Sequence, residues 1–387
     1  MANGASVQCV PIIAEDLPQL LAFAEEKRPD LTVVGPDNPL ALGIVDLFQQ
    51  KGLRIWGPNK RAAQFEGSKS FAQEFMDRWG IPTARSGVFT ETSKARQFAA
   101  DLGGRCAVKA DGLALGKGVL ICRSVEEARK AIDEMLVGGV FGAAGSRIVV
   151  QELLEGIELS LHALCDGTSA QLFPTSQDHK RALEGDQGLN TGGMGAYSPA
   201  PFLDGQQLEK VHKTILEPWL KGCKEEGIDF RGILYPGIML TSNGPKVLEF
   251  NARFGDPETQ VYMTRMETDL VELLNASVDG RLNKIDIRWS PMVSVCVVMA
   301  SGGYPGTYTK GKVIRGLDAI LDRKPVKVFH AGTTRLAGDI VTSGGRVLGV
   351  TSWAKDLKTA CAEAYEAVGL IAFEGSHFRR DIAAKAL

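Results

Sequence analysis

Apolar and polar positions along the first 66 residues follow the pattern of two helices and two short buried strands. Apolar residues recur at helical spacing behind Asp16 over residues 17–24 and again over residues 40–48, and each stretch predicts a helix. Residues 31–35 and 54–56 predict strands, because each is a short apolar run that ends at a Gly-Pro turn. This order predicts part of a doubly wound parallel sheet. Because the pattern opens on a helix, we expect the first strand and first turn of such a unit to be missing from the chain.

The pattern of apolar and polar positions changes after residue 66 and again near residue 292. Residues 68–79 predict a helix that ends at Gly80, and Ser124 with Glu127 forms a capping box before a helix over residues 125–135. The other elements expected in this middle part are strands over residues 106–109, 119–122, 147–152, 158–165, 232–240 and 246–251, and helices over residues 206–226 and 269–278. A third region begins near Met292 and combines strands over residues 293–299, 326–330 and 347–350 with a helix from residue 355 to about 369.

Composition and charge narrow the function classes. The chain has 387 residues, 44% hydrophobic and 23% charged, and this length predicts two or three domains. Its 44 basic and 46 acidic residues give a net charge of −2, so a basic surface for nucleic acid is not expected. The longest strong apolar run, residues 293–300, is much shorter than the ~20 residues of a membrane span, and the start of the chain does not resemble a secretory signal. Seven scattered cysteines without a CxxC pair argue against a disulfide framework or a zinc site. We therefore expect a cytoplasmic enzyme that acts on small molecules.

A glycine-rich segment at residues 109–119, KADGLALGKGV, is the first candidate for phosphate chemistry. Glycines let backbone amides approach phosphate oxygens, and Lys117 adds positive charge above them. The segment is not a Walker A loop, because three residues instead of four separate Gly112 from Gly116, no Ser or Thr follows the lysine, and residues 119–121 predict a strand. A hairpin with solvated lysines is the alternative interpretation.

A strand end near residue 250 carries the second candidate group. In KVLEFNARFGDPETQ, residues 246–260, Glu249 and Asn251 are two positions apart, so their side chains share one face of the strand. Their oxygen atoms suit Mg²⁺ that also binds phosphates, and Arg253, Asp256 and Glu258 follow directly. A solvated edge strand is the alternative, and the apolar residues around these positions argue against it.

A long loop over residues 175–201 is the third candidate. It places Asp178, His179 and Lys180 ahead of the sequence NTGGMG at residues 190–195. A loop of this length inside a compact domain is usually functional or disordered, and its mixed composition favours a substrate loop. His179 by itself is weak evidence, since a single histidine is more often a structural residue.

The segment QELLEGIELSL, residues 151–161, is the fourth candidate. Its carboxylates Glu152, Glu155 and Glu158 are suited to hydrogen bonds with an adenine amino group or with ribose hydroxyls. An ordinary hairpin explains this segment equally well.

Taken in order, these segments resemble the phosphoribosylamine–glycine ligase (glycinamide ribonucleotide synthetase) family of ATP-grasp enzymes. The matching segments are EGSKSFAQEFM at residues 66–76, KADGLALGKGV, QELLEGIE, SQDHKR at 176–181, NTGGMGAYSPAP at 190–201 and EFNARFGDPETQ at 249–260. VGPDNPLALGIVD at residues 34–46, ASGGYPGTYTKG at 300–311 and KVFHAGT at 327–333 extend the resemblance over nearly the whole chain.

The resemblance implies an α/β chain in three parts. Residues 1–66 would form a doubly wound parallel domain without its first strand. Residues 67–286 would form the ATP-grasp domain, in which two α+β subdomains surround ATP and the small lid subdomain covers about 84–152. Residues 287–387 would form a small C-terminal α+β domain.

The resemblance also implies a nucleotide site and a metal site. Glu249 and Asn251 match the family's magnesium ligands, with Mn²⁺ as an alternative metal. Leu154 and Glu152 fall where the family holds the adenine, and Glu158 falls at the ribose. The residues that match the phosphate-facing lysines and the flexible loop over the phosphates are Lys69, Lys109, Gly112, Gly116, Lys117 and Gly118.

Substrate and catalytic roles follow from the same resemblance. The residues that match the segments around glycine and the acyl phosphate are Asn190, Thr191, Gly192, Gly193, Gly195, Arg253, Asp256 and Glu258. Catalytic roles are implied for Lys109, Arg253 and Asp178.

The implied reaction joins glycine to 5-phosphoribosylamine. ATP would phosphorylate the glycine carboxylate, and the amine would attack glycyl phosphate to give glycinamide ribonucleotide, ADP and phosphate, as in purine synthesis. Positioning and charge neutralisation would supply most of the rate. The expected partners are therefore small molecules, without nucleic acid or membrane, and the chain is expected to be a monomer or a weak homo-oligomer.

The chain also departs from the family pattern. Members of the family usually open with a strand and a turn similar to GSGGREHA that helps hold the ribosyl phosphate, and we expect this chain to lack both. Leu189 stands where the family more often has proline, and we expect little effect. Two alternatives follow: a nucleotide-binding chain with impaired catalysis, and a different ATP-grasp ligase for another carboxylate and amine.

Overall fold

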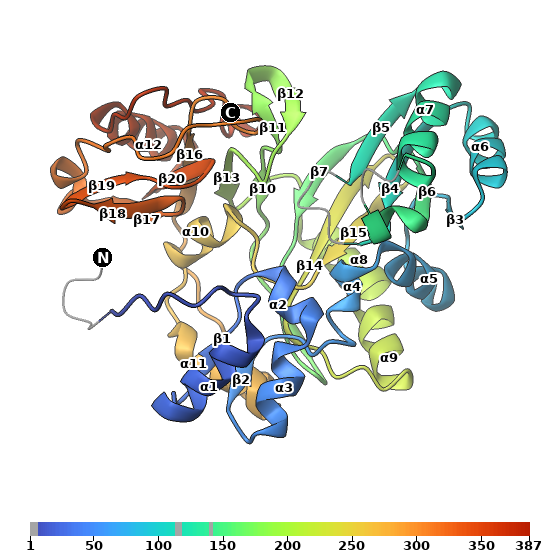
Figure 1. Ribbon diagram of the computed structural model, residues 1–387, viewed down its shortest axis with the longest axis horizontal. Helices are drawn as coiled ribbons and strands as arrows, with labels where there is room; N and C mark the ends of the chain where they lie inside the picture. The colour runs from blue at the N-terminus through green and yellow to red at the C-terminus, as the bar shows by residue number, and fades with distance from the viewer. Residues whose placement is uncertain (1–6, 113–117, 139–141) are drawn as a thin grey trace.

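The structure is a computed structural model that describes residues 7–112, 118–138 and 142–387. Figure 1 shows three sheet-based parts arranged around a central region, with the N-terminal segment below them in that view. The fold is α/β, as the sequence predicts.

The N-terminal unit combines helices with two short parallel strands. Its elements are α1 (Leu17–Lys27), β1 (Thr32–Val33), α2 (Asp37–Leu42), α3 (Ile44–Gln50), β2 (Ile55–Trp56) and α4 (Gln64–Gly67). The Asp16 side chain caps α1 by accepting a hydrogen bond from the Gln19 amide. Gly43, at φ +95°, separates α2 from α3, so the single helix expected over residues 40–48 is divided in two. The parallel pairing expected of this unit is present, with Thr32 opposite Ile55.

The small subdomain is a four-stranded antiparallel sheet with two helices, in the strand order β3-β6-β4-β5. Its elements are β3 (Ser86–Phe89), α6 (Thr92–Asp101), β4 (Arg105–Ala110), β5 (Val119–Arg123), α7 (Val125–Leu136) and β6 (Ile148–Glu152). Half of the predicted capping box of α7 is present: the Ser124 hydroxyl accepts from the Glu127 amide, but the Glu127 carboxylate accepts from the Arg123 amide and not from that of Ser124. The two helices and the sheet bury a hydrophobic core of their own.

The large sheet faces the small subdomain. Its order is β15-β14-β8-β9, and β7 also pairs with β14. The strands are β7 (Ile157–Ser160), β8 (Ala163–Asp166), β9 (Ala170–Leu172), β14 (Arg231–Thr241) and β15 (Gly244–Asn251). The surrounding helices are α5 (Lys69–Trp79), α8 (Gly205–Val211), α9 (Glu217–Glu225), α10 (Glu258–Met263) and α11 (Leu270–Asp279).

The long helix predicted over residues 206–226 is interrupted by a π-helical turn. This turn, His212–Leu216, connects α8 to α9, and the Glu217 amide bonds to the His212 carbonyl. Pro218 follows immediately, and a proline lacks an amide donor and crowds the carbonyl four residues earlier. The wider turn in front of Pro218 accommodates this crowding.

The third sheet joins two distant parts of the chain. Its order is β10-β13-β16-β20-β17, where the strands are β10 (Gln177–Asp178), β13 (Gly195–Ser198), β16 (Val293–Ala300), β17 (Val326–His330) and β20 (Arg346–Ala354). The remaining elements are α12 (Leu357–Leu370), the hairpins β11 (Arg181–Leu183) with β12 (Gln187–Asn190) and β18 (Thr333–Leu336) with β19 (Asp339–Thr342), and short 3₁₀ turns at Gly142–Ser146, Glu184–Asp186, Leu282–Lys284, Asp318–Ile320 and Ala384–Ala386. Because β13 pairs with β16 along its whole length, the loop expected to bind substrate is attached to the C-terminal region.

The main hydrophobic core continues from the helices of the large sheet into the C-terminal sheet. Phe65 of α4 lies in this core and connects the N-terminal unit to it. Its ring contacts the rings of Phe71, Phe75, Trp219, Phe230 and Phe250.

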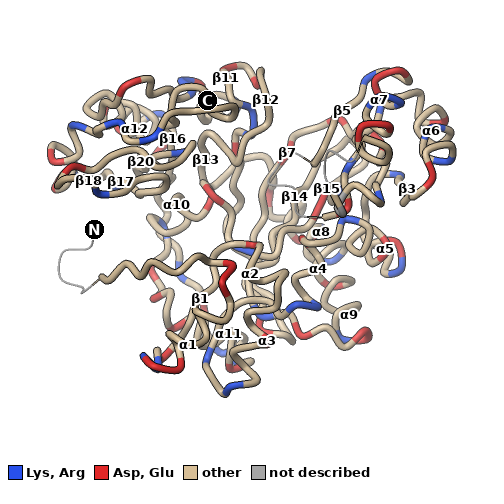
Figure 2. Tube along the Cα trace, viewed as in Figure 1, with Lys and Arg blue, Asp and Glu red and all other residues tan. Residues whose placement is uncertain are grey.

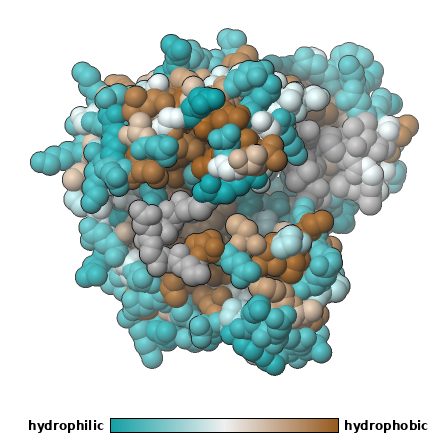
Figure 3. Space-filling view, turned by 60° about the vertical axis from the view of Figure 1, so that its left-hand side comes forward, coloured by the Kyte–Doolittle hydropathy of each residue, from teal (hydrophilic) through white to brown (hydrophobic). Residues whose placement is uncertain are grey.

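The surface carries mixed charge. Figure 2 shows basic and acidic residues interspersed along the whole trace, as expected from the near-zero net charge. In Figure 3 most of the visible face is hydrophilic, with apolar side chains gathered mainly in its upper part. Among the described residues, helices with the length and apolar character needed to cross a bilayer are absent.

Candidate active site

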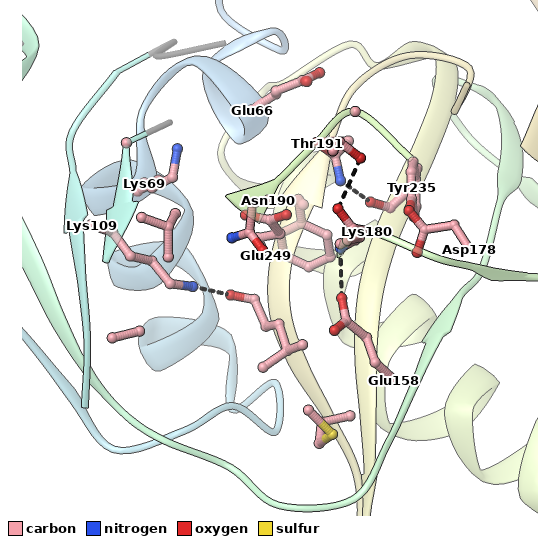
Figure 4. A pocket seen from close by; sticks show the side chains of 18 of the residues that line it. Glu66, Lys69, Lys109, Glu158, Asp178, Lys180, Asn190, Thr191, Tyr235 and Glu249 are labelled. Atoms are coloured by element: carbon pink, nitrogen blue, oxygen red, sulfur yellow. Dashed lines mark hydrogen bonds and ion pairs between the residues drawn. The ribbon is translucent and has the colours of Figure 1, made fainter. Parts of the chain in front are cut away.

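A cavity of about 1080 Å³ lies between the small subdomain and the large sheet and extends to the C-terminal region. Four parts of the chain line it. The N-terminal unit contributes Gly35, Pro36, Asp37 and Glu66; the small subdomain Lys109, Gly118 and Glu152; the large sheet Glu249, Asn251 and Arg253; and the C-terminal region Tyr304, Arg346 and Lys385. In Figure 4 the labelled lysines Lys69 and Lys109 lie on one side of this cavity, and Lys180 and Glu158 lie across from them.

Lys109 stands near the end of β4, and its ammonium group is directed into the cavity. The Nζ atom donates to the main-chain oxygen of Leu248 at 2.9 Å, and the side chain is 7% exposed. Burial lowers the pKa of Lys109 to about 8, although Glu249 opposes that shift. The glycine-rich segment runs between two antiparallel strands, since the Ala110 amide bonds to the Gly118 carbonyl at 2.8 Å. The described residues on either side of 113–117 confirm that a strand, β5, and not a helix follows the glycines, so the segment is not a Walker A loop.

A β-bulge supplies the acceptor for Lys109. The register of β15 against β14 passes from Glu249 opposite Gly237 to Val247 opposite Ile238, which leaves Leu248 as the extra residue. A bulged residue is left out of the ladder, so its carbonyl is available to a side chain. The bulge therefore ties the large sheet to the small subdomain.

Glu249 and Asn251 project from the end of β15 on the same face, as their spacing predicts. Burial opposes ionisation of Glu249, but Lys180, Lys109 and other nearby cations together hold the pKa of its carboxyl below the ordinary value. The Asn251 amide nitrogen donates to the Tyr235 carbonyl at 3.3 Å, so the Oδ1 oxygen is the atom that could act as a ligand. An ionised carboxylate and an amide oxygen thus meet at one strand end.

This pair fits a divalent cation that shares its coordination with phosphates. Within the described residues, groups of three or more His, Cys, Asp or Glu in metal-binding geometry are absent. Mg²⁺ is commonly held by one or two protein carboxylates together with phosphate oxygens and water. Two protein donors at the cavity wall suit that mode better than an all-protein metal site.

Arg253 follows β15 and contacts the N-terminal unit. Its guanidinium lies 3.0 Å from the Glu66 carboxylate, and the other Glu66 oxygen accepts from the Ala252 amide at 2.8 Å. Burial raises the pKa of Glu66, while Arg253 opposes that shift. The ion pair places Arg253 at the junction of the N-terminal unit, the large sheet and the cavity.

Lys180 lies in the middle of three carboxylates. Its Nζ is 2.5 Å from Glu158 Oε1. Burial disfavours its charge, but Glu158, Asp178 and Glu249 outweigh this, and the pKa of Lys180 lies well above the ordinary value. Burial raises the pKa of Asp178 well above its ordinary value, with Glu258 and Glu158 adding to the shift and Lys180 opposing it.

Glu258 belongs to a buried hydrogen-bond network that the sequence analysis missed. Its Oε1 accepts from the Tyr235 hydroxyl at 2.6 Å and from the Ser160 hydroxyl at 2.9 Å. His162 stacks on Tyr235, with ring centroids 4.1 Å apart, and its Nε2 accepts from the Gly255 amide at 3.2 Å. Burial lowers the pKa of His162 to about 3, so the neutral ring is the form that accepts this bond. A single histidine far from any motif gave no signal in the sequence.

Asp111 is a second residue that the sequence analysis missed. Its carboxylate accepts from the Ser70 amide at 3.1 Å, from the Ser68 and Ser70 hydroxyls, and from Arg147 at 2.5 Å. These bonds tie the start of the glycine-rich loop to the first turn of α5. The residue lies inside the quoted motif KADG, which was the available signal.

His179 is structural, as its isolation in the sequence suggests. The ring is buried, its Nδ1 lies 3.2 Å from the Gly195 carbonyl, and its Nε2 accepts from the Ala383 amide. Burial lowers its pKa to about 4.

Most of the predicted site residues lie on the cavity wall. The wall includes Lys69, Lys109, Gly118, Glu152, Leu154, Glu158, Asp178, Asn190, Thr191, Gly192, Glu249, Asn251, Arg253, Asp256 and Glu258. Gly112, Gly193 and Gly195 do not line it. Gly116 and Lys117 lie outside the described residues.

Packing explains the two glycines that were expected at the substrate. A Cβ on Gly195 would lie 2.7 Å from the Cys296 carbonyl oxygen, because β13 packs closely against β16 there. Gly193 has φ +114°, and a Cβ there would lie 2.5 Å from Pro257. Both glycines therefore have a structural reason that is independent of substrate.

Three models of one protein family match the chain in sequence order. They are the N domain of phosphoribosylglycinamide synthetase at residues 1–66, its ATP-grasp (A) domain at residues 67–259 and its C domain at residues 294–385. The chain belongs to the phosphoribosylglycinamide synthetase family. The ATP-grasp model covers the small subdomain and the large sheet, the two parts that face each other across the cavity.

Relatives and solved structures agree with this family. The chain is 48% identical over 379 residues to the phosphoribosylamine–glycine ligase of Vibrio vulnificus strain CMCP6, covering 98% of this chain and 88% of the relative. The ligase of Halalkalibacterium halodurans is also 48% identical, with the same coverage. The crystal structure of the Thermotoga maritima ligase superposes with a TM-score of 0.82 at 33% identity, over 94% of this chain and 88% of that chain. The biotin carboxylase domain of Hydrogenobacter thermophilus 2-oxoglutarate carboxylase shares the fold, with a TM-score of 0.75 at 18% identity over 94% of this chain and 79% of that one.

Proposed function

We propose that this chain is an ATP-dependent ligase that joins glycine to 5-phosphoribosylamine and yields glycinamide ribonucleotide, ADP and phosphate. The observation that carries the proposal is the ordered match of all three domain models of one family to this chain. The gathering of lysines, a carboxylate and an amide around one cavity supports it chemically. This reaction belongs to purine biosynthesis.

The nucleotide occupies the space between the small subdomain and the large sheet in this proposal. Lys69 and Lys109 contact its phosphates, because both ammonium groups lie on the same side of the cavity. Glu152 and Leu154 hold the adenine and Glu158 the ribose, since these residues line one stretch of wall between β6 and β7. The loop that would cover the phosphates contains Gly112, Gly116, Lys117 and Gly118.

Glu249 and Asn251 would hold the metal, Mg²⁺ or Mn²⁺. A bound divalent cation neutralises phosphate charge and brings the phosphoryl group into line for transfer. Lys180 and Lys109 hold the pKa of Glu249 below its ordinary value and so favour the ionised form that binds a metal.

Two steps complete the reaction, and the chain's residues act by charge and position. In the first, an oxygen of the glycine carboxylate attacks the γ-phosphorus of ATP, and ADP leaves. Lys109 and Arg253 stabilise the negative charge that is spread over the transferring group. In the second, the amine nitrogen attacks the carbonyl carbon of glycyl phosphate, and phosphate leaves with one former carboxylate oxygen.

Asp178 would receive the proton that the amine nitrogen loses. Asp178 lines the cavity, and the positive charge of Lys180 favours its ionised carboxylate, the form that can accept a proton. Asn190, Thr191, Gly192, Asp256 and Glu258 surround the same part of the cavity and would contact glycine and the amine.

Several expectations stay predictions. These are the division into units at residues 1–66, 67–286 and 287–387, the cytoplasmic location, the absence of nucleic-acid and membrane partners, and a monomer or weak homo-oligomer. The relatives lend no support to impaired catalysis or to a different carboxylate and amine.

The decisive experiment measures ADP release with ATP and Mg²⁺, adding glycine and freshly generated phosphoribosylamine separately and together. The ligase requires both substrates for sustained ADP release. Glycine labelled with ¹⁸O in its carboxylate should transfer one ¹⁸O atom to inorganic phosphate, because the acyl phosphate oxygen leaves with phosphate. ADP release that is independent of either substrate, or phosphate without ¹⁸O, would overturn the proposal. Tight ATP binding without turnover would favour the alternative of a nucleotide-binding chain with impaired catalysis.

A further inference from the structure

Arg346, the first residue of β20, connects the C-terminal region to two loops at the cavity. Its Nη1 atom donates to the carbonyl oxygens of Gly192 at 3.0 Å and Asp256 at 2.6 Å. Its Nη2 atom lies 3.0 Å from the Asp256 carboxylate. One guanidinium therefore holds the main chains of two loops that are more than 60 residues apart in the sequence.

The two loops are shaped around this contact. At Gly192 a Cβ would lie 2.8 Å from Arg346 Cζ, so a larger residue would displace the guanidinium. At the next position, the Cβ absent from Gly193 makes room for Pro257 of the other loop. The glycine pair of the NTGGMG sequence thus lets Arg346 and Pro257 pack against the same short stretch of backbone.

Tyr304 makes a second contact from the C-terminal region. Its hydroxyl oxygen accepts from the Gly192 amide at 3.2 Å. Gly192 is thereby held through its carbonyl by Arg346 and through its amide by Tyr304. Both side chains also line the cavity.

Both loops line the cavity, and neither contains the residues that the proposed function assigns to the adenine and ribose, Glu152, Leu154 and Glu158. The first loop begins at Asn190, the last residue of β12, and continues through Thr191 to Gly193. The second loop runs from Arg253 to Glu258. A change at Arg346 should therefore alter the substrate half of the cavity and leave the nucleotide half as it was.

We propose that Arg346 is a positioning residue for the ligation reaction, holding the 190–193 loop against the 253–258 loop so that the C-terminal region completes the glycine and amine half of the cavity. The kinetic consequences of this inference rest on the proposed function. The contact that Arg346 makes between the two loops does not depend on it. A guanidinium suits the task because its planar set of donors reaches several acceptors at once, whereas a lysine ammonium acts as a point charge.

The test compares Arg346→Met with Arg323→Met. Arg323 is a matched control, because it also pairs with carboxylates, Glu363 at 3.2 Å and Glu366 at 2.8 Å, but within the C-terminal region. Losing charge-assisted hydrogen bonds should lower kcat/KM for both glycine and phosphoribosylamine by roughly 10–100-fold in Arg346→Met. The dissociation constant of ADP, measured by calorimetry, should stay within about twofold of the parent value if only the substrate half is altered. Arg323→Met should match the parent protein in both measurements.

Hydrogen exchange separates this inference from the proposed function. Peptides that cover residues 188–194 and 253–258 should exchange faster in Arg346→Met than in the parent chain or in Arg323→Met. If the parent chain lacks ligase activity, the proposed function fails while the exchange result still tests the loop contact. Addition of methylguanidinium to Arg346→Ala should restore part of the activity, and methylammonium should not.

Three results would overturn the positioning role. The first is unchanged kinetics and exchange in Arg346→Met. The second is an equal loss in Arg323→Met or a parallel loss of ADP affinity, either of which would mean general destabilisation. The third is an effect confined to KM for the amine with normal loop exchange, which would mean that Arg346 contacts that substrate directly.

Discussion

Lys109 and Glu249 illustrate how single residues in this cavity depend on one another. Burial disfavours charge on both side chains, and each partly restores the charge of the other. The main-chain oxygen of Leu248, next to Glu249, also holds the ammonium group of Lys109 in place. The charge state of Lys109 therefore depends on Glu249, and that of Glu249 depends in part on Lys109.

The first prediction concerns Lys109→Met. Removing one cation that faces the transferring phosphate should lower kcat/KM for ATP by about 10²–10³-fold. In the parent protein kcat/KM should fall as the pH rises above about 8, because Lys109 loses its charge there. A profile of kcat/KM against pH tests this fall. If Lys109→Met shows the same fall at alkaline pH, the fall belongs to another group.

Lys109 also has a consequence for stability. Its folded pKa of about 8 lies below the ordinary 10.5, so its charge costs the folded state free energy below pH 8, and the cost disappears as the pH rises toward 10.5. The free energy of unfolding of the parent protein should therefore rise by up to about 3 kcal/mol relative to Lys109→Met between these two pH values. Urea unfolding of both proteins across this range checks the sign.

The second prediction concerns Glu249→Gln. The change keeps the shape of the side chain but removes the charge that would hold the metal and that favours charged Lys109. We expect turnover to fall by at least about 10²-fold and the pKa of Lys109 to fall below its parent value. The pH dependence of Lys109 acylation, followed by mass spectrometry, measures that pKa. A Glu249→Gln protein with near-parent turnover would contradict the proposed role of Glu249 in holding the metal.

At the scale of elements, the loops around the cavity are fixed by close backbone approach. The bond of Lys109 to the bulged Leu248 and the packing of Gly193 on Pro257 each bring together segments that are distant in sequence. Hydrophobic periodicity predicted many of the strands and helices, but not β3, α6, β9, α10 or the hairpin of β18 with β19, which are short or weakly amphipathic. The single strand expected over residues 158–165 is divided into β7 and β8. The bulge and the π-helical turn of His212–Leu216 were not located from periodicity. Each shifts the pattern by one residue, as in β15, where the buried positions pass from Val247 to Phe250, and so short a segment does not distinguish such a shift from ordinary irregularity.

The third prediction tests this packing with Gly193→Ala. At φ +114° and 2.5 Å from Pro257, an added methyl group strains the backbone and displaces the neighbouring loop. We expect the free energy of unfolding to fall by roughly 1–3 kcal/mol, with reduced turnover.

Gly205→Ala is the control, because a Cβ there meets nothing within 4 Å and the residue begins a helix. Its stability should change by less than about 0.5 kcal/mol. Chemical unfolding of both variants decides the matter, and a Gly193→Ala protein as stable as the parent would contradict the packing argument.

At the scale of the whole molecule, buried polar contacts join the N-terminal unit to the large sheet. Trp56 of β2 donates from its indole Nε1 to the Ser277 hydroxyl at 3.0 Å, and Ser277 donates to the Cys165 carbonyl of β8 at 2.6 Å. One hydroxyl thus connects the N-terminal unit to the large sheet. Its loss leaves two buried polar groups without this partner.

The fourth prediction is that Ser277→Ala lowers the free energy of unfolding by about 1–3 kcal/mol. Ser169→Ala is the matched control, since the buried Ser169 hydroxyl has no hydrogen-bond partner within the described part of the chain. It should leave stability nearly unchanged or slightly raised. Equal losses in the two variants would mean that the Trp56–Ser277–Cys165 chain contributes nothing specific.

The sequence by itself determined the α/β class, the approximate positions of most of the longer elements and the segments that carry polar chemistry. These are local properties, because strand and helix periods and the residue types at a strand end can be seen within a few consecutive positions. The resemblance of the segments then pointed to the family that the comparisons support.

Tertiary structure alone decided which residues meet. The pairing of β13 with β16, the position of Arg346 between two loops and the contact of His162 with the Gly255 amide all join residues far apart along the chain. The lowered pKa of Lys109 is likewise a property of the cavity, since burial and the Glu249 charge act only after the two sheets have come together. Periodicity records which side of an element is buried, and it carries no information about the partner that buries it.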